Sequence, residues 1–221
     1  MTEHVNPKPK STADSARKDE LELRRLEVEL REKEIQVARM EREEEQTLAS
    51  DESNLVYTFY DTVSEKSVKA CIDTLSKWSR KSKGKPIKII LNSPGGNVID
   101  GLALYDYLRL IANKHRHHIT VAVLGQGASM AGILLCAGDK RIIGNSGFIL
   151  IHEITSASWG SMGAVADDVA FTGMLWDRLT SILASRSKLS VEEIKRKAHR
   201  RDWWLSAQSA LELGFVDEII T

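Results

Sequence analysis

The sequence has few cysteines, prolines and aromatic residues, and it carries no net charge. Its 221 residues include two cysteines, four prolines and 6% aromatic side chains, and 31 basic residues balance 31 acidic ones. Cys71 and Cys136 lie in apolar patterns, which favours small core residues in a reducing compartment over a disulfide. A chain with no net charge has no overall electrostatic field that would attract nucleic acid or a membrane surface. No apolar run approaches the ~18 residues of a membrane span. We therefore expect neither a nucleic-acid nor a membrane partner.

The sequence also lacks a charged-then-apolar leader at its start, so we expect no secretory signal and a cytoplasmic location. His115, His117 and His118 form a short cluster before an apolar run. No Cys, Asp or Glu stands beside them at the spacing of metal ligands, which favours a surface loop over a metal site.

The first 50 residues differ in composition from the rest. Residues 1–18 are polar, contain Pro7 and Pro9, and are predicted to be a disordered tail. Residues 19–50 are predicted to be a charged helix followed by a linker, because 19–46 contain no Gly or Pro. Apolar residues occupy the a and d positions of a heptad repeat, and Lys33 interrupts the series. These residues are Leu23, Leu26, Leu30, Val37 and Met40. Two interpretations stay open, an oligomerisation or partner helix and a solvated, marginal helix.

Residues 55–221 alternate short β-branched runs with amphipathic segments, which is typical of an α/β domain. Strands are expected near 56–60, 86–91, 119–124, 140–143, 148–152 and 215–220. Helices are expected near 64–79, 98–111, 130–137, 162–186 and 207–213, the last capped by Ser206. A further short helix is expected to begin at a capping box on Ser190. The helix from about 162 is apolar on more than one face, which suggests burial against a second subunit as well as its own core.

The most informative stretch is 125–132, Gly-Gln-Gly-Ala-Ser-Met-Ala-Gly. An apolar strand leads into it and a small-residue helix leads out, so Ser129 lies at a strand–turn–helix junction. One interpretation is a nucleophile elbow, although the spacing differs from G-x-S-x-G. The other is a simple helix N-cap.

Two further positions fit hydrolytic chemistry. Gly95 and Gly96 form a turn before a helix, which can direct backbone N–H groups at an oxyanion or be an ordinary tight turn. His152 ends an apolar strand, where an imidazole can act as acid or base or be structural. Together with Ser129 and the Met130 amide, these residues suggest a serine-hydrolase site.

Several separated motifs resemble the Clp protease proteolytic subunit (ClpP) family over roughly residues 55–221. They lie at 92–96, 125–130, 151–152, 205–207 and 214–217. The resemblance implies a ClpP/crotonase-like spiral of ββα units, with Ser129 as nucleophile, His152 as base, and Gly95, Gly96 and Met130 in the oxyanion and substrate segments. It also implies heptameric rings stacked as a tetradecamer, polypeptide substrates delivered by an AAA+ unfoldase, and no metal or cofactor.

The chain departs from that family pattern in three places. The family's third catalytic residue, an aspartate, falls on Lys197 or Ala198, so Asp202 is the predicted substitute and Asp167 and Asp168 are further candidates. Glu153-Ile154 stands where the family has Gln-Pro. The charged residues 1–50 replace a short axial loop.

The predicted function is a serine endopeptidase that cleaves unfolded polypeptides inside an oligomeric chamber. The alternatives are a virus-type head-maturation protease of the same fold, a ring subunit of impaired activity, and an acyl-CoA enzyme of the wider superfamily. The last has no evident use for the pair Ser129 and His152.

Overall fold

The computed structural model describes residues 12–48 and 53–221, which belong to two compact units, 1–53 and 54–221. The first unit contains one long helix, α1 (Thr12–Leu48). It begins before residue 19, where the sequence predicted its start, because residues 12–18 contain no Gly or Pro to stop it. Residues 1–11 and 49–52, and with them parts of the predicted tail and linker, lie outside the described residues.

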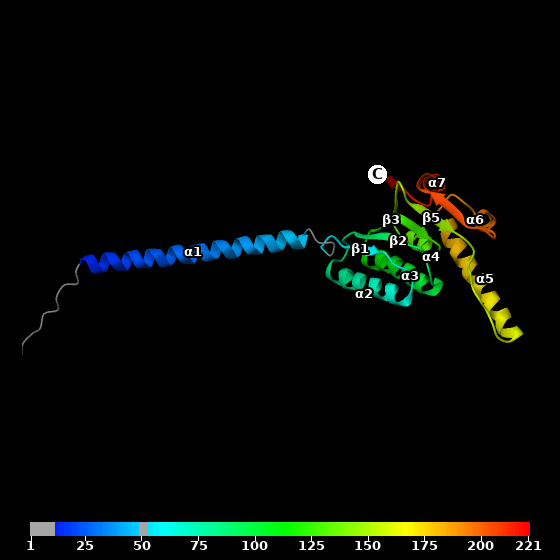
Figure 1. The fold of residues 1–221 in the computed structure, drawn as a ribbon, viewed down its shortest axis with the longest axis horizontal. Helices are drawn as coiled ribbons and strands as arrows, with labels where there is room; N and C mark the ends of the chain where they lie inside the picture. The colour runs from blue at the N-terminus through cyan, green and yellow to red at the C-terminus, as the bar shows by residue number, and fades with distance from the viewer. Residues whose placement is uncertain (1–11, 49–52) are drawn as a thin grey trace, which may run out of the picture. The chain divides into compact units, whose positions relative to one another are not determined.

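The second unit is an α/β domain, as predicted (Figure 1). Its strands are β1 (Val56–Phe59), β2 (Ile87–Ser93), β3 (Ile119–Ala128), β4 (Lys140–Gly144), β5 (Phe148–Ile151), β6 (Trp203–Ser206) and β7 (Glu218–Ile220). Its helices are α2 (Glu65–Lys81), α3 (Val98–His115), α4 (Met130–Leu135), α5 (Met162–Ser185), α6 (Val191–Ala198) and α7 (Ala207–Glu212).

The sheet follows the order β1-β2-β3-β4-β7, and every neighbouring pair on this path is parallel. β3 is long enough to have two partners on one side. Its first half, through Val123, pairs with β4, and its last residues, 126–128, pair with β5. β6 then pairs antiparallel with β5. The end of β3 therefore lies beside β5 and no longer beside β4, so the carboxyl ends of β3 and β5 lie together.

Local sequence explains most of the helix boundaries. Ser64 and Ser190 each form a capping box at the start of α2 and α6, and Ser206 caps α7. Arg116 ends α3 in the left-handed region, and Gly214 follows α7 with a φ of 79°. The capping box at Ser190 and the cap at Ser206 were predicted from the sequence and are confirmed.

One continuous core fills the space between the helices and the sheet. Its fully buried members include Leu75 of α2, Leu108 of α3, Ile119 of β3 and Ile149 of β5. Cys71 and Cys136 are buried and free, as predicted, and burial raises the pKa of the Cys136 thiol to about 11. Both cysteines therefore act as small core residues.

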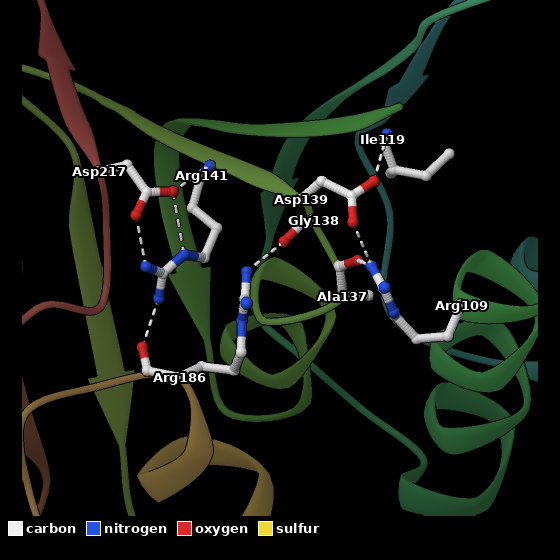
Figure 2. Close-up of polar contacts among 8 residues, drawn as sticks. All are labelled: Arg109, Ile119, Ala137, Gly138, Asp139, Arg141, Arg186 and Asp217. Carbon is white, nitrogen blue, oxygen red and sulfur yellow. Dashed lines mark hydrogen bonds and ion pairs between the residues drawn. The ribbon is translucent and has the colours of Figure 1, made fainter. Parts of the chain in front are cut away.

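Arginines tie together the edge of the sheet where β3 and β4 begin (Figure 2). Arg141 is buried and binds Asp217 before β7 at 2.5 Å, as well as the carbonyl oxygens of Gly214 and Arg186. Arg109 of α3 binds Asp139 at 2.7 Å, and the other Asp139 oxygen accepts from the first amide of β3. Burial acts to raise the pKa of Asp217, but the hydrogen bonds from Arg141 hold it below its ordinary value.

Two local predictions were wrong. The strand before Ser129 was expected to end at Leu124, but β3 continues to Ala128 because its last residues gain β5 as a partner. His117 was expected in a surface loop, but it is buried. Its ring nitrogens contact the Lys85 carbonyl oxygen at 2.7 Å and the Ser79 hydroxyl at 2.9 Å, which satisfies the imidazole inside the domain.

Candidate active site

The predicted site residues come from three strand ends on one edge of the sheet. β2 leads into the turn with Gly95 and Gly96, β3 leads into Ser129, and β5 leads into His152. All three strands are parallel, so their carboxyl ends meet at this edge, opposite the arginine network. A pocket of about 200 Å³ lies there, and Gly96, Ser129, Met130 and His152 all line it.

Ser129 occupies a strained backbone conformation between β3 and α4. Its φ is 54° and its ψ is −123°, a region that residues with a side chain rarely adopt. Its amide donates to the Leu150 carbonyl oxygen at 2.8 Å, which holds the turn against β5. Ser129 is the N-cap residue of α4 by position, as the N-cap interpretation expects, but its side chain makes no capping hydrogen bond. Ser129 lines the pocket from this turn, which is the place of the nucleophile in a nucleophile elbow.

Gly95 and Gly96 both have left-handed φ values, 91° and 146°. A Cβ on Gly95 would lie 2.6 Å from the Ala128 carbonyl oxygen and 2.7 Å from the Ser129 Cβ. A Cβ on Gly96 would lie 2.2 Å from the Val63 carbonyl oxygen. Both positions therefore require glycine, since any side chain would push the turn away from Ser129.

Two backbone amides beside Ser129 have no hydrogen-bond acceptor in the described part of the chain. Met130 is the first residue of α4, where an amide has no partner within the helix. The Gly96 amide also lacks an acceptor among residues 12–48 and 53–221, whereas the Gly95 amide is held by Ser93 Oγ at 3.2 Å. Gly96 and Met130 line the same pocket, so their amides are available for an oxyanion.

His152 is half-buried at the end of β5, and its ring is held from one side. Its Nδ1 lies 2.6 Å from the Glu153 carbonyl oxygen. A carbonyl oxygen can only accept a hydrogen bond, so Nδ1 is the donor, and in the neutral form of this ring Nε2 is the nitrogen free to accept. No hydrogen bond joins His152 to Ser129 in the described chain. Such bonds are often long in the absence of substrate.

The predicted acids do not reach His152 in the described part of the chain. Asp202 is exposed just before β6, and Asp167 and Asp168 are exposed on α5. None of the three has a hydrogen bond or ion pair with the imidazole. At the position of the family's aspartate, Ala198 is fully buried in the core and Lys197 lies 5.2 Å over the Trp203 ring. The role of Asp202 stays a prediction.

Glu153, which the sequence marked as a departure from the family pattern, has carboxylate contacts that the sequence did not predict. Its carboxylate accepts from His199 Nδ1 at 3.0 Å and from the Arg200 amide at 3.2 Å. The hydrogen bond from His199, followed by that from Arg200, holds the pKa of Glu153 below its ordinary value. These contacts fasten the backbone after His152 to the segment between α6 and β6. The only sequence signal was the acid directly after His152.

The pocket wall away from Ser129 is apolar. It is formed by α5 and by residues near the starts of α3 and α4, together with the segment after His152. The apolar lining residues are Val98, Ile133, Ile154, Trp176, Leu179 and Leu183.

Within residues 12–48 and 53–221, no group of three His, Cys, Asp or Glu gathers as a metal site. No helix of the described ranges is long and apolar enough to cross a membrane.

Comparison with known proteins shows which family this chain resembles. The family model described as Clp protease matches residues 43–221, which is more than half of the chain. The chain is 34% identical to the ATP-dependent Clp protease proteolytic subunit 2 of Tropheryma whipplei over 61% of its own length and 73% of that protein. It is 36% identical to the subunit 2 of Thermobifida fusca, over 65% and 69%. It is also 36% identical to the proteolytic subunit of Dehalococcoides mccartyi, over 64% and 69%.

Proposed function

The chain belongs to the Clp protease family and is a serine-type peptidase, and we propose that Ser129 is its nucleophile and His152 its general base. The observation that carries this proposal is the strained turn at Ser129. Ser129, whose side chain makes no capping hydrogen bond, lines a pocket together with His152 and with Gly96 and Met130, the residues of the two unpaired amides. Backbone strain at a residue between a parallel strand and a helix is costly and is retained where it serves a reaction.

The proposed reaction is acyl transfer from a peptide bond. Ser129 Oγ attacks the carbonyl carbon while His152 Nε2 takes the hydroxyl proton. The carbonyl oxygen becomes an oxyanion that accepts from the Gly96 and Met130 amides. The C–N bond then breaks, and the leaving amine takes the proton from His152. Water, activated by the same imidazole, hydrolyses the acyl-enzyme and restores Ser129.

We propose that the Glu153 carbonyl oxygen performs the orienting task of the missing aspartate. It accepts a hydrogen bond from Nδ1, with 2.6 Å between the nitrogen and the oxygen, and so fixes the tautomer that leaves Nε2 free to accept. The Glu153 carboxylate, bound to His199 and Arg200, keeps that carbonyl in place. A neutral carbonyl stabilises an imidazolium less than a carboxylate does, so slower acylation is expected than with a full triad.

Polypeptides are the proposed substrates, since the relatives are named as proteolytic subunits. The apolar pocket wall would receive an apolar side chain next to the scissile bond. Gly95 and Gly96 and the segment 153–156 would flank an extended substrate backbone. The relatives are named as subunits of ATP-dependent Clp proteases, so we propose that a Clp-type AAA+ ATPase delivers unfolded chains.

We further propose that the chain assembles into heptameric rings that stack as a tetradecamer through α5. Large apolar side chains of that helix are exposed in the single chain, which favours burial against another copy. They are Met162, Val169, Phe171 and Met174. The buried residues of α5 lie near its other end, at Leu179, Thr180 and Leu183.

The test is labelling of the assembled protein with a fluorophosphonate probe, with the adduct mapped by mass spectrometry. An adduct on Ser129, absent from Ser129→Ala, is expected. Asp202→Asn should label at the wild-type rate if the Glu153 carbonyl orients His152, and a drop of tenfold or more would return that role to Asp202. No adduct on a folded, assembled protein would favour the second candidate, an inactive ring subunit, which is suggested by the lack of a carboxylate bonded to the His152 ring among residues 12–48 and 53–221.

A further inference from the structure

Helix α1 presents large apolar side chains that its own unit, as far as it is described, leaves exposed. Its large apolar residues between 21 and 40 are each 47–62% exposed, far above a buried level. They are Leu21, Leu23, Leu26, Val28, Leu30, Ile35, Val37 and Met40. An apolar surface of this extent on a charged helix is typical of an interaction site.

These residues form two stripes on opposite faces of the helix. Stripe A follows heptad spacing at Leu23, Leu26, Leu30, Val37 and Met40. Stripe B repeats every seven residues at Leu21, Val28 and Ile35. Each residue of stripe B stands two positions before a residue of stripe A, and two positions in an α-helix turn by about 200°. The helix therefore has two apolar faces, where a simple coiled coil has one.

The two stripes are flanked by opposite charges. The residues beside stripe A, in the e and g positions, are acidic except for Gln36: Glu20, Glu22, Glu27, Glu29, Glu34 and Glu41. The residues three or four positions from stripe B are mostly arginines: Arg17, Arg24, Arg25, Arg31 and Arg39, with Glu32 as the acid among them. Among the described side chains of α1, no ion pair within the chain uses these charges.

The charges beside the two stripes determine which stripe can pack against which in a second copy. Packing stripe A against stripe A of another copy in parallel would set Glu22 against Glu27 and Glu29 against Glu34 of the other chain, and like charges in these positions destabilise the pair. Packing stripe B against itself would oppose arginines. Packing stripe A against stripe B instead brings glutamates to arginines along the whole contact, so the helix is complementary to a second copy of itself.

We propose that α1 of one copy packs side by side against α1 of a neighbouring copy, with stripe A of one helix on stripe B of the next. This contact uses two different faces, so each helix has a neighbour on both sides, and the series ends only by closing into a ring. The inference rests on α1 alone and does not depend on the active site.

Cysteine cross-linking of the full-length protein tests this arrangement. In helices related by rotation about a parallel axis, Val28 of one copy and Leu30 of the next differ in height by about 3 Å. The double variant Val28→Cys/Leu30→Cys should give a ladder of covalent oligomers under mild oxidation. Val28→Cys and Leu30→Cys alone should give none, and the native Cys71 and Cys136 are buried and serve as internal controls.

A charge swap provides the second measurement. Arg24→Glu/Arg31→Glu in the double-cysteine chain should lower the ladder yield several-fold, and adding Glu27→Arg/Glu34→Arg should restore it because the complementarity is then reversed in both stripes. Dimers from Leu30→Cys alone would overturn the proposal in favour of a symmetric pair. The absence of any ladder would overturn it too. Fluorophosphonate labelling of Ser129 in the same samples reports on the active site separately, so failure of either proposal can be recognised.

Discussion

Because the backbone at Ser129 is strained, we predict that replacing Ser129 with glycine gives a more stable fold than replacing it with alanine. Both Ser129→Ala and Ser129→Gly remove the hydroxyl, but only glycine relaxes a φ of 54° with a ψ of −123°. Such a backbone region costs roughly 1–3 kcal/mol for a residue with a Cβ. Glycine loses about 0.5–1 kcal/mol through its greater freedom in the unfolded chain.

Subtracting the entropy cost of glycine from the strain that it relieves leaves Ser129→Gly more stable than Ser129→Ala by about 1 kcal/mol. In a chain of this length that corresponds to a rise in Tm of roughly 2–4 °C. Thermal unfolding followed by circular dichroism, at one scan rate and one protein concentration, measures it. Both variants should fail to react with the fluorophosphonate.

Ser82 provides the matched control, since its φ is −134° and requires no glycine. There, Ser82→Gly should be no more stable than Ser82→Ala. A Ser129→Gly protein that melts at or below the temperature of Ser129→Ala would refute the claim that the turn is strained, and with it the main structural argument for Ser129 as nucleophile.

Two other perturbations follow from the same contacts. Gly95→Ala forces a Cβ to within 2.7 Å of the Ser129 Cβ at a left-handed φ, so it should lose fluorophosphonate labelling and roughly 1–3 kcal/mol of stability. Gly173→Ala, in a helix with open space around it, should instead be neutral or slightly stabilising. The lowered pKa of Asp217 means that its contribution to stability is present above the pKa of the unfolded chain and is lost as pH falls through the lower folded value. Urea unfolding between neutral pH and pH 3 should show that decline, and Asp217→Asn should be less stable at neutral pH and show a shallower decline; an unchanged slope would contradict the role of the Arg141 contact.

Some features of the site were readable from the sequence because they depend on short-range chemistry. Paired glycines at 95 and 96 indicated a turn with unusual φ values, and the structure confirms both. An apolar strand, a serine and a small-residue run indicated a sharp junction at Ser129, but the same residues also allowed an N-cap. Only the backbone conformation and the uncapped side chain separate the two interpretations.

Other features depend on partners far away in the chain. The length of β3 is set by pairing with β5, and His117 is buried by contacts with Ser79 and Lys85, which no local pattern reveals. The sequence alone established the family resemblance, the α/β class and the heptad spacing in the first 50 residues, because motif order and periodicity survive in one dimension. The tertiary structure placed the Glu153 carbonyl oxygen against His152 Nδ1 and gave Asp202 no hydrogen bond to that ring within the described residues, since both outcomes depend on distances between atoms that the order of residues does not contain.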